Sequence, residues 1–171
     1  MFIPKFIIPD LRTDHAGETG AVFIYKGILL VSKNKEINEF ANNHLLTEKK
    51  HLEIIDKVLP DDEKSKLLFL WKILGFLTGL IPALIGEKFI YVTIFFVESF
   101  VEKHYSEQII KLKKEKNSKE LIQLLEKLKN DEISHKEDSL KRFGKLNLLQ
   151  KIWGYIVETG SKTAVLISHK I

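Results

Sequence analysis

Hydrophobic residues recur every three to four positions along most of the 171-residue chain, which is the spacing of one face of an α-helix. Clean alternation of apolar and polar residues is missing, as are the Asn-Gly pairs typical of hairpins. The pattern predicts an all-α fold. Helices are expected over residues 10–32, 36–58, 66–86, 87–114, 117–143 and 147–168. Asp10 is expected to cap the start of the first helix and Gly144 the end of the fifth.

The stretch LLFLWKILGFLTGLIPALIG, residues 67–86, is the most apolar part of the chain. Its length reaches that of a transmembrane helix, but Lys72 lies inside it and Pro82 is expected to break its last turn. Its apolar residues surround the helix rather than forming one stripe. We favour a helix at a membrane interface, a position that suits Trp71 and Lys72. A buried core helix and a true membrane span are the alternatives.

Composition and charge narrow the function classes. The 27 basic and 23 acidic residues give a net charge of +4, too small and too evenly spread to indicate a nucleic-acid partner. The absence of cysteine excludes disulfides, thiolate catalysis and Cys-ligated metal sites. The N-terminus MFIPKFIIPDL resembles no signal peptide, so the protein is expected to stay in the compartment where it is made. A single domain over residues 1–171 is expected.

Two Glu-x-x-His pairs provide the first candidate chemistry: Glu48 with His51, and Glu132 with His135. Residues three apart lie on one face of a helix, so both side chains of a pair can reach one metal ion. A single pair of this kind is more often an ordinary surface contact, and the spacing of two further glutamates decides between these interpretations.

Glu18 precedes Glu48 by 30 residues, and Glu98 precedes Glu132 by 34 residues. The midpoints of these intervals fall at the polar break SKNK, residues 32–35, and beside the break KEKNS, residues 114–118. If each break is the turn of an antiparallel helical hairpin, each single glutamate lies level with its own Glu-x-x-His pair. Two docked hairpins then bring four carboxylates and two imidazoles to one height in a bundle.

This is the ligand set of a carboxylate-bridged di-iron site in a four-helix bundle. Carboxylates and imidazoles favour iron or manganese, and carboxylates among apolar residues need a compensating partner. The predicted metal ligands, which act in catalysis through the metal centre, are Glu18, Glu48, His51, Glu98, Glu132 and His135.

Other polar residues are candidates for a supporting role around these ligands. Tyr105 lies seven positions after Glu98, on the same helix face two turns on, and can hydrogen-bond to the ligands; an ordinary core tyrosine is the alternative. His104 and Asp131 are further candidates for contacts with the ligands. The remaining polar positions carry weaker patterns. Asp14 and His15 are expected to orient Glu18 or to cap the helix start, and His44 and His169 are expected to be ordinary histidines.

Four motifs resemble those of a known family: LRTDHAGETGAVFIYKG, TEKKHL, VESFVEKHYSEQI and NDEISHKED. In order and spacing they are similar to the motifs of the demethoxyubiquinone hydroxylases, the Coq7-like ferritin-fold proteins, from about residue 11 to 168. The resemblance assigns the same six ligands and matches His104 and Tyr105 to a His-Tyr pair near the family's site. The chain departs from the family pattern at Thr19, Ser99 and Lys136, none of which is a ligand.

The resemblance implies a ferritin-like four-helix bundle with an additional apolar helix at the membrane interface. It implies a di-iron monooxygenase that hydroxylates the ring of a demethoxy-ubiquinone or ubiquinol precursor, late in ubiquinone biosynthesis. The implied cofactors are two iron ions, with O2 and NADH as co-substrates. The implied partners are a polyprenyl quinone in the bilayer, the membrane surface and quinone-biosynthesis helper proteins. The implied location is peripheral, on the cytoplasmic face of a bacterial inner membrane or the matrix face of a mitochondrial one.

Two rival functions belong to other classes. A ferritin- or rubrerythrin-like protein that handles iron or peroxide would share the ligand set, but a soluble storage shell has no use for the apolar segment. A metal-free helical scaffold on a membrane would share the apolar segment, but it leaves the matched heights of the ligands unexplained.

Overall fold

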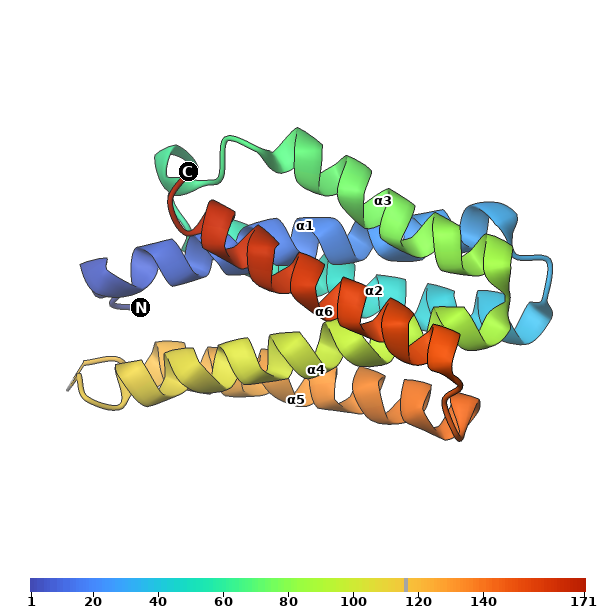
Figure 1. The fold of residues 1–171 in the computed structure, drawn as a ribbon. Helices are drawn as coiled ribbons and strands as arrows, with labels where there is room; N and C mark the ends of the chain where they lie inside the picture. Colours follow the sequence, from blue (N-terminus) through green and yellow to red (C-terminus); the bar gives the residue numbers. More distant parts are fainter. Residues whose placement is uncertain (116) are drawn as a thin grey trace.

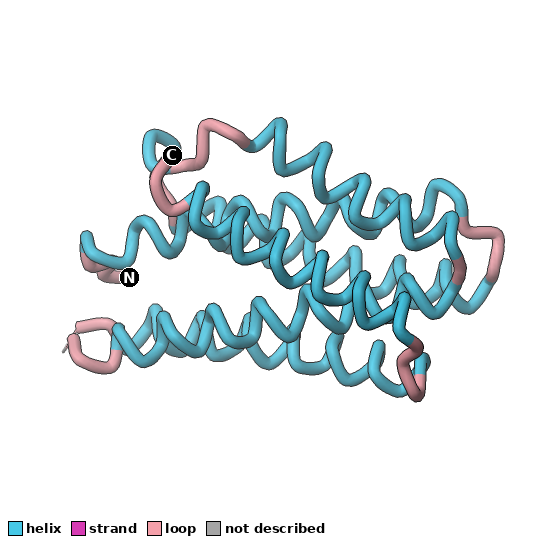
Figure 2. Tube along the Cα trace, viewed as in Figure 1, coloured by secondary structure: helices cyan, strands magenta, loops and turns pink. Residues whose placement is uncertain are grey.

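A computed structural model describes residues 1–115 and 117–171, and in this part of the chain every regular element is a helix (Figures 1 and 2). Helices make up 85% of the structure, which confirms the all-α prediction. Two short 3₁₀ helices, η1 (Lys5–Ile7) and η2 (Asp61–Glu63), accompany the α-helices. The α-helices are α1 (Ile8–Val31), α2 (Lys35–Val58), α3 (Leu68–Ile85), α4 (Glu87–Leu112), α5 (Lys119–Phe143) and α6 (Leu148–Ser168).

The ends of the helices follow local sequence signals. The side chain of Asn34 accepts a hydrogen bond from the backbone N–H of Glu36 at the start of α2. Asn147 and Gln150 form a reciprocal capping box at the start of α6. Gly144 ends α5 with a φ of 63°, a left-handed conformation that favours glycine. The predicted breaks therefore lie within a few residues of the observed ones.

Asp10 does not cap α1 as expected. The helix begins at Ile8, because Pro9 takes a helical φ readily in a first turn. Asp10 lies inside that turn, where its buried carboxylate accepts hydrogen bonds from Nζ of Lys111 on α4, the shorter at 2.8 Å. Its charge contributes to docking α1 on α4 rather than to starting the helix.

The helices α1, α2, α4 and α5 form the four-helix bundle, built from the hairpins α1–α2 and α4–α5 (Figure 1). The first hairpin turns at residues 32–34. The predicted second break, residues 114–118, includes Lys116, which lies outside the described residues. Buried apolar residues form two clusters, one that includes Tyr25, Phe40 and Tyr91 and one around Leu11, Ile55 and Leu125. The polar centre described below lies between them.

Helix α3 packs against α1 through glycines. A Cβ atom at Gly79 would overlap the carbonyl group of Ile24, and one at Gly75 would overlap that of Gly20. These helices therefore approach each other backbone to backbone. The predicted break at Pro82 is wrong. Helix α3 continues through Pro82 to Ile85, and Gly86 follows as its C-cap.

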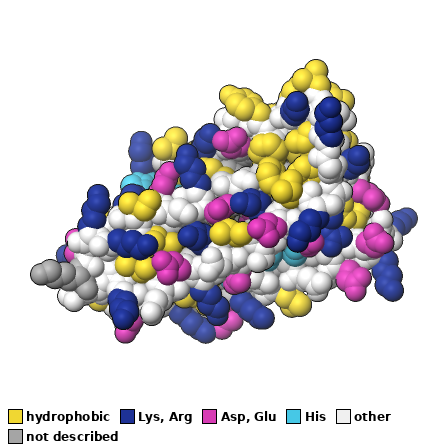
Figure 3. Space-filling view, turned by 90° about the horizontal axis from the view of Figure 1, so that it is seen from below, with side chains coloured by type: hydrophobic (Ala, Val, Ile, Leu, Met, Phe, Trp, Pro, Cys, Tyr) yellow, Lys and Arg dark blue, Asp and Glu magenta, His cyan; other side chains and the backbone are white. Residues whose placement is uncertain are grey.

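The exposed faces of α3 and α6 are unusually apolar. Trp71 does not lie at the surface as expected, because its ring is buried and its Nε1 donates to Oγ of Ser65 at 3.2 Å. Among the described residues, α3 is the one helix whose length and composition would allow it to cross a membrane, and 22% of that stretch is buried. Seen from below, Figure 3 shows charges of both signs interspersed over most of the face, with hydrophobic side chains gathered on the part that protrudes at its upper edge. The large exposed apolar side chains on the two helices include Phe69, Leu77, Leu84, Leu148, Leu149, Tyr155 and Ile156.

Candidate metal centre

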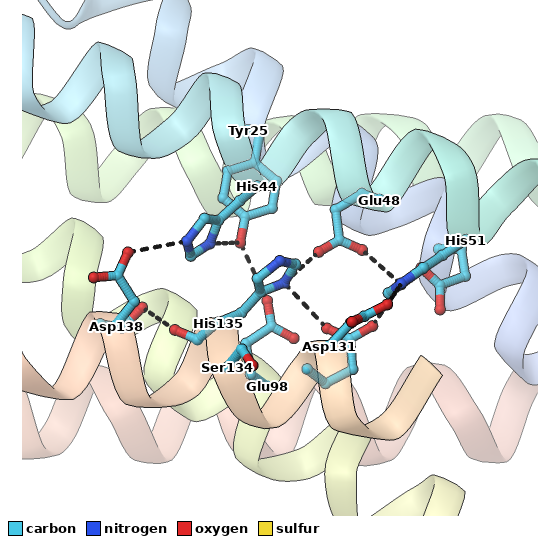
Figure 4. Close-up of polar contacts among 12 residues, drawn as sticks. Tyr25, His44, Glu48, His51, Glu98, Asp131, Ser134, His135 and Asp138 are labelled. Atoms are coloured by element: carbon cyan, nitrogen blue, oxygen red, sulfur yellow. Dashed lines mark hydrogen bonds and ion pairs between the residues drawn. The ribbon is translucent and has the colours of Figure 1, made fainter. Parts of the chain in front are cut away.

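Six acidic and histidine side chains meet in the middle of the four-helix bundle (Figure 4). Helices α1 and α4 contribute one glutamate each, and α2 and α5 contribute one Glu-x-x-His pair each. All six are buried, and Glu48 is only 1% exposed. The structure thus brings together all the predicted ligands: Glu18, Glu48, His51, Glu98, Glu132 and His135.

The side chains form two overlapping groups, each able to hold one ion. In each group, one ligand atom from each of four residues lies within 4.8 Å of the others. Glu48 and Glu132 belong to both groups, so their two carboxylates are placed to bridge a pair of ions. The first group also contains Glu18 and His51, and the second contains Glu98 and His135.

The histidines pair with the bridging carboxylates across the bundle. Nδ1 of His51 lies 2.9 Å from Oε1 of Glu132, and Nδ1 of His135 lies 2.9 Å from Oε1 of Glu48. The contacts of His135 lack the geometry of a hydrogen bond, however. Three buried atoms in the centre therefore lie close to one another but make no hydrogen bond among the described residues: Oε1 of Glu48, Oε2 of Glu132 and Nδ1 of His135. Buried polar atoms without a partner are rare, and these point to an absent ligand. A pair of cations fits this donor set.

The electrostatics of the centre point the same way. Burial and the charges of neighbouring carboxylates hold the pKa values of Glu18 and Glu98 well above the usual range. Burial would lower the pKa of His51 and His135, but bonds to the carboxylates raise each to about 10. Burial would raise the pKa of Glu132, but bonds from both histidines lower it to about 2. Without a metal, bound protons must therefore offset the buried negative charge.

The chemistry of the donors narrows the choice of metal. The set contains carboxylate oxygens and imidazole nitrogens, and the chain has no thiol. Carboxylate-rich sites with a Glu-x-x-His pair from each of two helices suit iron or manganese.

Two of the predicted supporting residues contact the ligands. The hydroxyl of Tyr105 donates to Oε1 of Glu18 at 2.6 Å, and Oδ2 of Asp131 lies 3.1 Å from Nε2 of His51. A carboxylate on the outer nitrogen of a ligating histidine fixes the orientation of the ring. His104 makes no such contact, since its Nε2 lies 2.7 Å from Oγ1 of Thr13.

Asp14 and His15 do not orient Glu18 as expected. Oδ1 of Asp14 accepts a 2.6 Å hydrogen bond from Nε2 of Gln108, while Nε2 of His15 lies 3.1 Å from Oδ1 of Asp56. Neither side chain hydrogen-bonds to the Glu18 carboxylate, and neither caps the helix start. Burial is the main cause that raises the pKa of Asp14.

Two residues near the ligands were missed from the sequence. The hydroxyl of Tyr25 donates to Oε1 of Glu98 at 3.2 Å and lies 3.1 Å from Nδ1 of His44. The spacing rule that singled out Tyr105 also applies to Tyr25, which lies seven positions after Glu18. His44 carries a weaker signal, since it precedes Glu48 by four positions and so shares its helix face.

A cavity of about 310 Å³ leads from the centre to the outside of the bundle. Its walls come from α1, α3, α4 and α6 and are mostly apolar, and its floor includes the carboxylates of Glu18 and Glu98. Gly17 lines it, with no atom within 4 Å of where its Cβ would be. The wall between α3 and α6 includes Trp71, Leu74, Gly75, Ile156, Val157 and Gly160.

Comparisons with known proteins identify one family. The profile of the family described as ubiquinone biosynthesis protein COQ7 matches residues 6–168. A Dictyostelium discoideum protein and a human protein, both named NADPH-dependent 3-demethoxyubiquinone 3-hydroxylase, mitochondrial, are 28% and 29% identical to the chain. A Rhodospirillum rubrum protein named 3-demethoxyubiquinol 3-hydroxylase is 27% identical. Each alignment covers 94% of this chain and 76% of the relative.

Proposed function

This chain belongs to the family of the ubiquinone biosynthesis protein COQ7, and we propose that it hydroxylates the ring of a demethoxy-ubiquinone or demethoxy-ubiquinol precursor. The observation that carries the proposal is the pair of overlapping ligand groups at the floor of an apolar cavity. A storage protein needs the ligand groups alone, whereas a ring hydroxylase also needs room for an apolar substrate beside them.

The proposed cofactor is a pair of iron ions. Glu18 and His51 would hold one ion, Glu98 and His135 the other, and two bridging glutamates would hold both. When bound, such a centre supplies the reduction of O2 and the oxygen atom that is added to the ring. The protein residues fix the geometry of the centre and keep it away from bulk water.

The cavity suits the ring of a quinone with an apolar tail. A volume of about 310 Å³ lies at the lower end of the range for small-molecule pockets and has room for a substituted ring, but not for a long prenyl chain as well. The tail would leave between α3 and α6, whose outer faces are apolar. Gly17 removes side-chain bulk on the α1 side, where the flat ring would pass.

The tyrosines beside the centre hold protons at defined atoms. The hydroxyl of Tyr105 donates its proton in a hydrogen bond to Oε1 of Glu18, and that of Tyr25 donates to Oε1 of Glu98. Burial is the main cause that raises the pKa of both phenols far above the usual value. Both tyrosines therefore stay neutral and fix one oxygen of each unshared carboxylate.

The proposed reductant is a reduced pyridine nucleotide. The family resemblance predicts NADH, whereas the names of several relatives specify NADPH. The protein is proposed to sit on a membrane surface through the apolar faces of α3 and α6, where a polyprenyl quinone is available. Quinone-biosynthesis helper proteins are proposed as further partners. The names of several relatives place those proteins in mitochondria. For this chain, the proposed location is the matrix face of a mitochondrial inner membrane or the cytoplasmic face of a bacterial one.

The test is a reconstituted reaction with a defined product. Purified protein is loaded anaerobically with Fe²⁺, placed in liposomes with a demethoxyquinone, and given ¹⁸O2 with NADH or NADPH in parallel. The expected result is about two iron ions per chain and a product carrying one ¹⁸O atom, detected by mass spectrometry. Fewer than about one iron per chain would overturn the metal centre. Iron oxidation or peroxide consumption without a labelled quinone would favour the iron- or peroxide-handling rival instead.

A further inference from the structure

The two halves of the metal centre are supported in different ways. In the half that contains Glu18, the histidine His51 is bound through its outer nitrogen by Asp131 at 3.1 Å. In the half that contains Glu98, the histidine His135 is packed against another imidazole, that of His44. The described residues place no ring as close to His51, since its centroid lies 6.5 Å from that of His135.

His44 lies flat against His135. The ring centroids are 4.1 Å apart, and the planes differ by 16°. Phe40 packs on His44 as well, with ring centroids 4.1 Å apart, so the imidazole of His44 is held between aromatic neighbours. His44 is 6% exposed and lies at the inner side of α2. A ring held this firmly restricts rotation of His135 away from the centre.

The two nitrogens of His44 have different partners. Nδ1 lies 3.1 Å from the hydroxyl of Tyr25, which donates to Oε1 of Glu98. Nε2 lies 3.2 Å from Oδ2 of Asp138 on α5 (Figure 4). Oδ1 of Asp138 accepts a hydrogen bond from Nε of Arg142 at 3.1 Å, one helical turn on. His44 is therefore anchored on α5, and from there it contacts His135 directly and Glu98 through Tyr25.

We propose that His44 is a positioning residue for one of the two metal positions, the one formed with Glu98 and His135. It fixes the ring of His135 by stacking and the carboxylate of Glu98 through Tyr25. The other position, formed with Glu18 and His51, depends on Asp131 and Tyr105 in its place. The two metal positions would therefore have separate residues supporting their unshared ligands. This inference rests on the proposed metal centre.

The experiment measures the affinity of the whole chain for each of two Co²⁺ ions, which replace iron and report their coordination through visible absorption. His44→Ala is expected to lower the affinity for one of the two Co²⁺ ions by about 10- to 100-fold, the usual effect of losing a residue that holds a metal ligand in place. Only the absorption of that ion is expected to change. Asp131→Ala is expected to lower the affinity for the other ion by a similar factor. The double variant is expected to bind both ions more weakly.

Two further variants separate positioning from folding. His44→Phe keeps an aromatic ring against His135 but loses both hydrogen bonds, so its second Co²⁺ is expected to bind with intermediate affinity. His15→Ala is the matched control, because His15 is a buried histidine with an Asp partner and no contact with the ligands. It is expected to bind two ions as the wild type does, whatever its effect on the melting temperature.

The outcomes distinguish the two proposals. If the wild type binds two Co²⁺ ions and both His44 variants bind them with wild-type affinity and spectrum, the role of His44 is overturned and the metal centre stands. Equal weakening of both ions by His44→Phe also overturns it, since that result indicates a general loss of structure. A wild type that binds fewer than two ions overturns the metal centre together with this inference.

Discussion

Tyr105 on α4 donates a 2.6 Å hydrogen bond to the carboxylate of Glu18 on α1. Tyr25 on α1 makes the reciprocal contact, donating at 3.2 Å to Glu98 on α4. Each tyrosine lies seven residues after the glutamate of its own helix and binds the glutamate of the other helix. Each of the two unshared carboxylates thus accepts a hydrogen bond from a tyrosine on the other helix of the same pair.

Loss of the Tyr105 hydrogen bond is expected to weaken metal binding in the half of the centre that contains Glu18. In Tyr105→Phe the ring and its packing remain, but Oε1 of Glu18 loses its donor, which typically costs about 1–3 kcal/mol at a buried site. Urea unfolding of the metal-free protein is expected to show a loss of this size. Affinity for one of the two metal ions is expected to fall about tenfold. Tyr155→Phe is the control, because Tyr155 is exposed on α6; equal behaviour of the two variants would contradict the prediction.

Glu98→Gln is expected to stabilise the metal-free protein while removing its activity. Burial, followed by the charges of Glu132 and Glu48, raises the pKa of Glu98 well above the usual value, so the fold disfavours its ionised form. The amide removes this penalty, which amounts to about 1.4 kcal/mol for each unit by which the fold raises the pKa, up to the pH of the measurement. It also removes a ligand, so hydroxylation is expected to stop while helicity is retained.

The measurements are urea unfolding after treatment with a chelator, circular dichroism and product analysis. Glu107→Gln on the same helix is the control, since its side chain is exposed and is expected to change neither stability nor turnover. A variant of Glu98 that still hydroxylates the quinone would overturn its assignment as a ligand.

The helices and the heights of the ligands were predictable from the sequence. Caps such as Asn147 and Gly144 act on their own chain neighbours, so their effect is local. The level of Glu18 beside Glu48 follows from the helical rise and the position of one turn. The face of Trp71 was not predictable, because an all-round apolar helix does not show which side packs on α1.

Contacts between distant helices were the part that the sequence left open. His44 and Asp138 are 94 positions apart, and their contact depends on how α2 and α5 are rotated about their axes. A histidine without a local partner pattern is usually ordinary, which is why His44 was predicted to be so. Asp14 illustrates the converse. Its position one turn before Glu18 indicated a contact between the two side chains, but its carboxylate accepts a hydrogen bond from Gln108 on α4 instead.

The stability of the metal-free protein is expected to fall as the pH rises from about 6.5 to about 10. Burial opposes the charged forms of His51 and His135, but the carboxylates raise both pKa values to about 10, so in this range the folded state binds more protons than the unfolded state. Metal ions replace these protons, so metal affinity is expected to rise over the same range.

The measurements are urea unfolding of chelator-treated protein at several pH values and proton release on addition of Fe²⁺ without oxygen. The metal-loaded protein serves as the comparison, because its stabilisation relative to the metal-free form should grow with pH. A metal-free protein that becomes more stable between these pH values would contradict the assigned pairing of histidines with carboxylates.

Gly79→Ala is expected to disrupt the docking of α3 on α1. The added Cβ would overlap the carbonyl group of Ile24, and backbone cannot move aside as a flexible side chain can. Overpacking of this kind costs about 1–3 kcal/mol. Gly160→Ala on α6 is the control, because no atom lies within 4 Å of its Cβ, and better helix propensity should stabilise that variant by up to about 1 kcal/mol. Thermal unfolding is expected to show a lower melting temperature for Gly79→Ala and a higher one for Gly160→Ala than for the wild type.

Binding to liposomes is expected to depend on the exposed apolar side chains of α3 and α6. Leu84 and Leu149 are 68% and 67% exposed, and each would gain about 1.5–3 kcal/mol by entering a bilayer interface. Leu84→Glu and Leu149→Glu are each expected to lower the partition coefficient about tenfold or more, measured by sedimentation with vesicles of neutral lipid. Leu46→Glu on α2 is the control, because Leu46 is 57% exposed but lies on a helix outside the α3–α6 face. Equal loss of binding in all three variants would show that overall charge rather than this face governs membrane association.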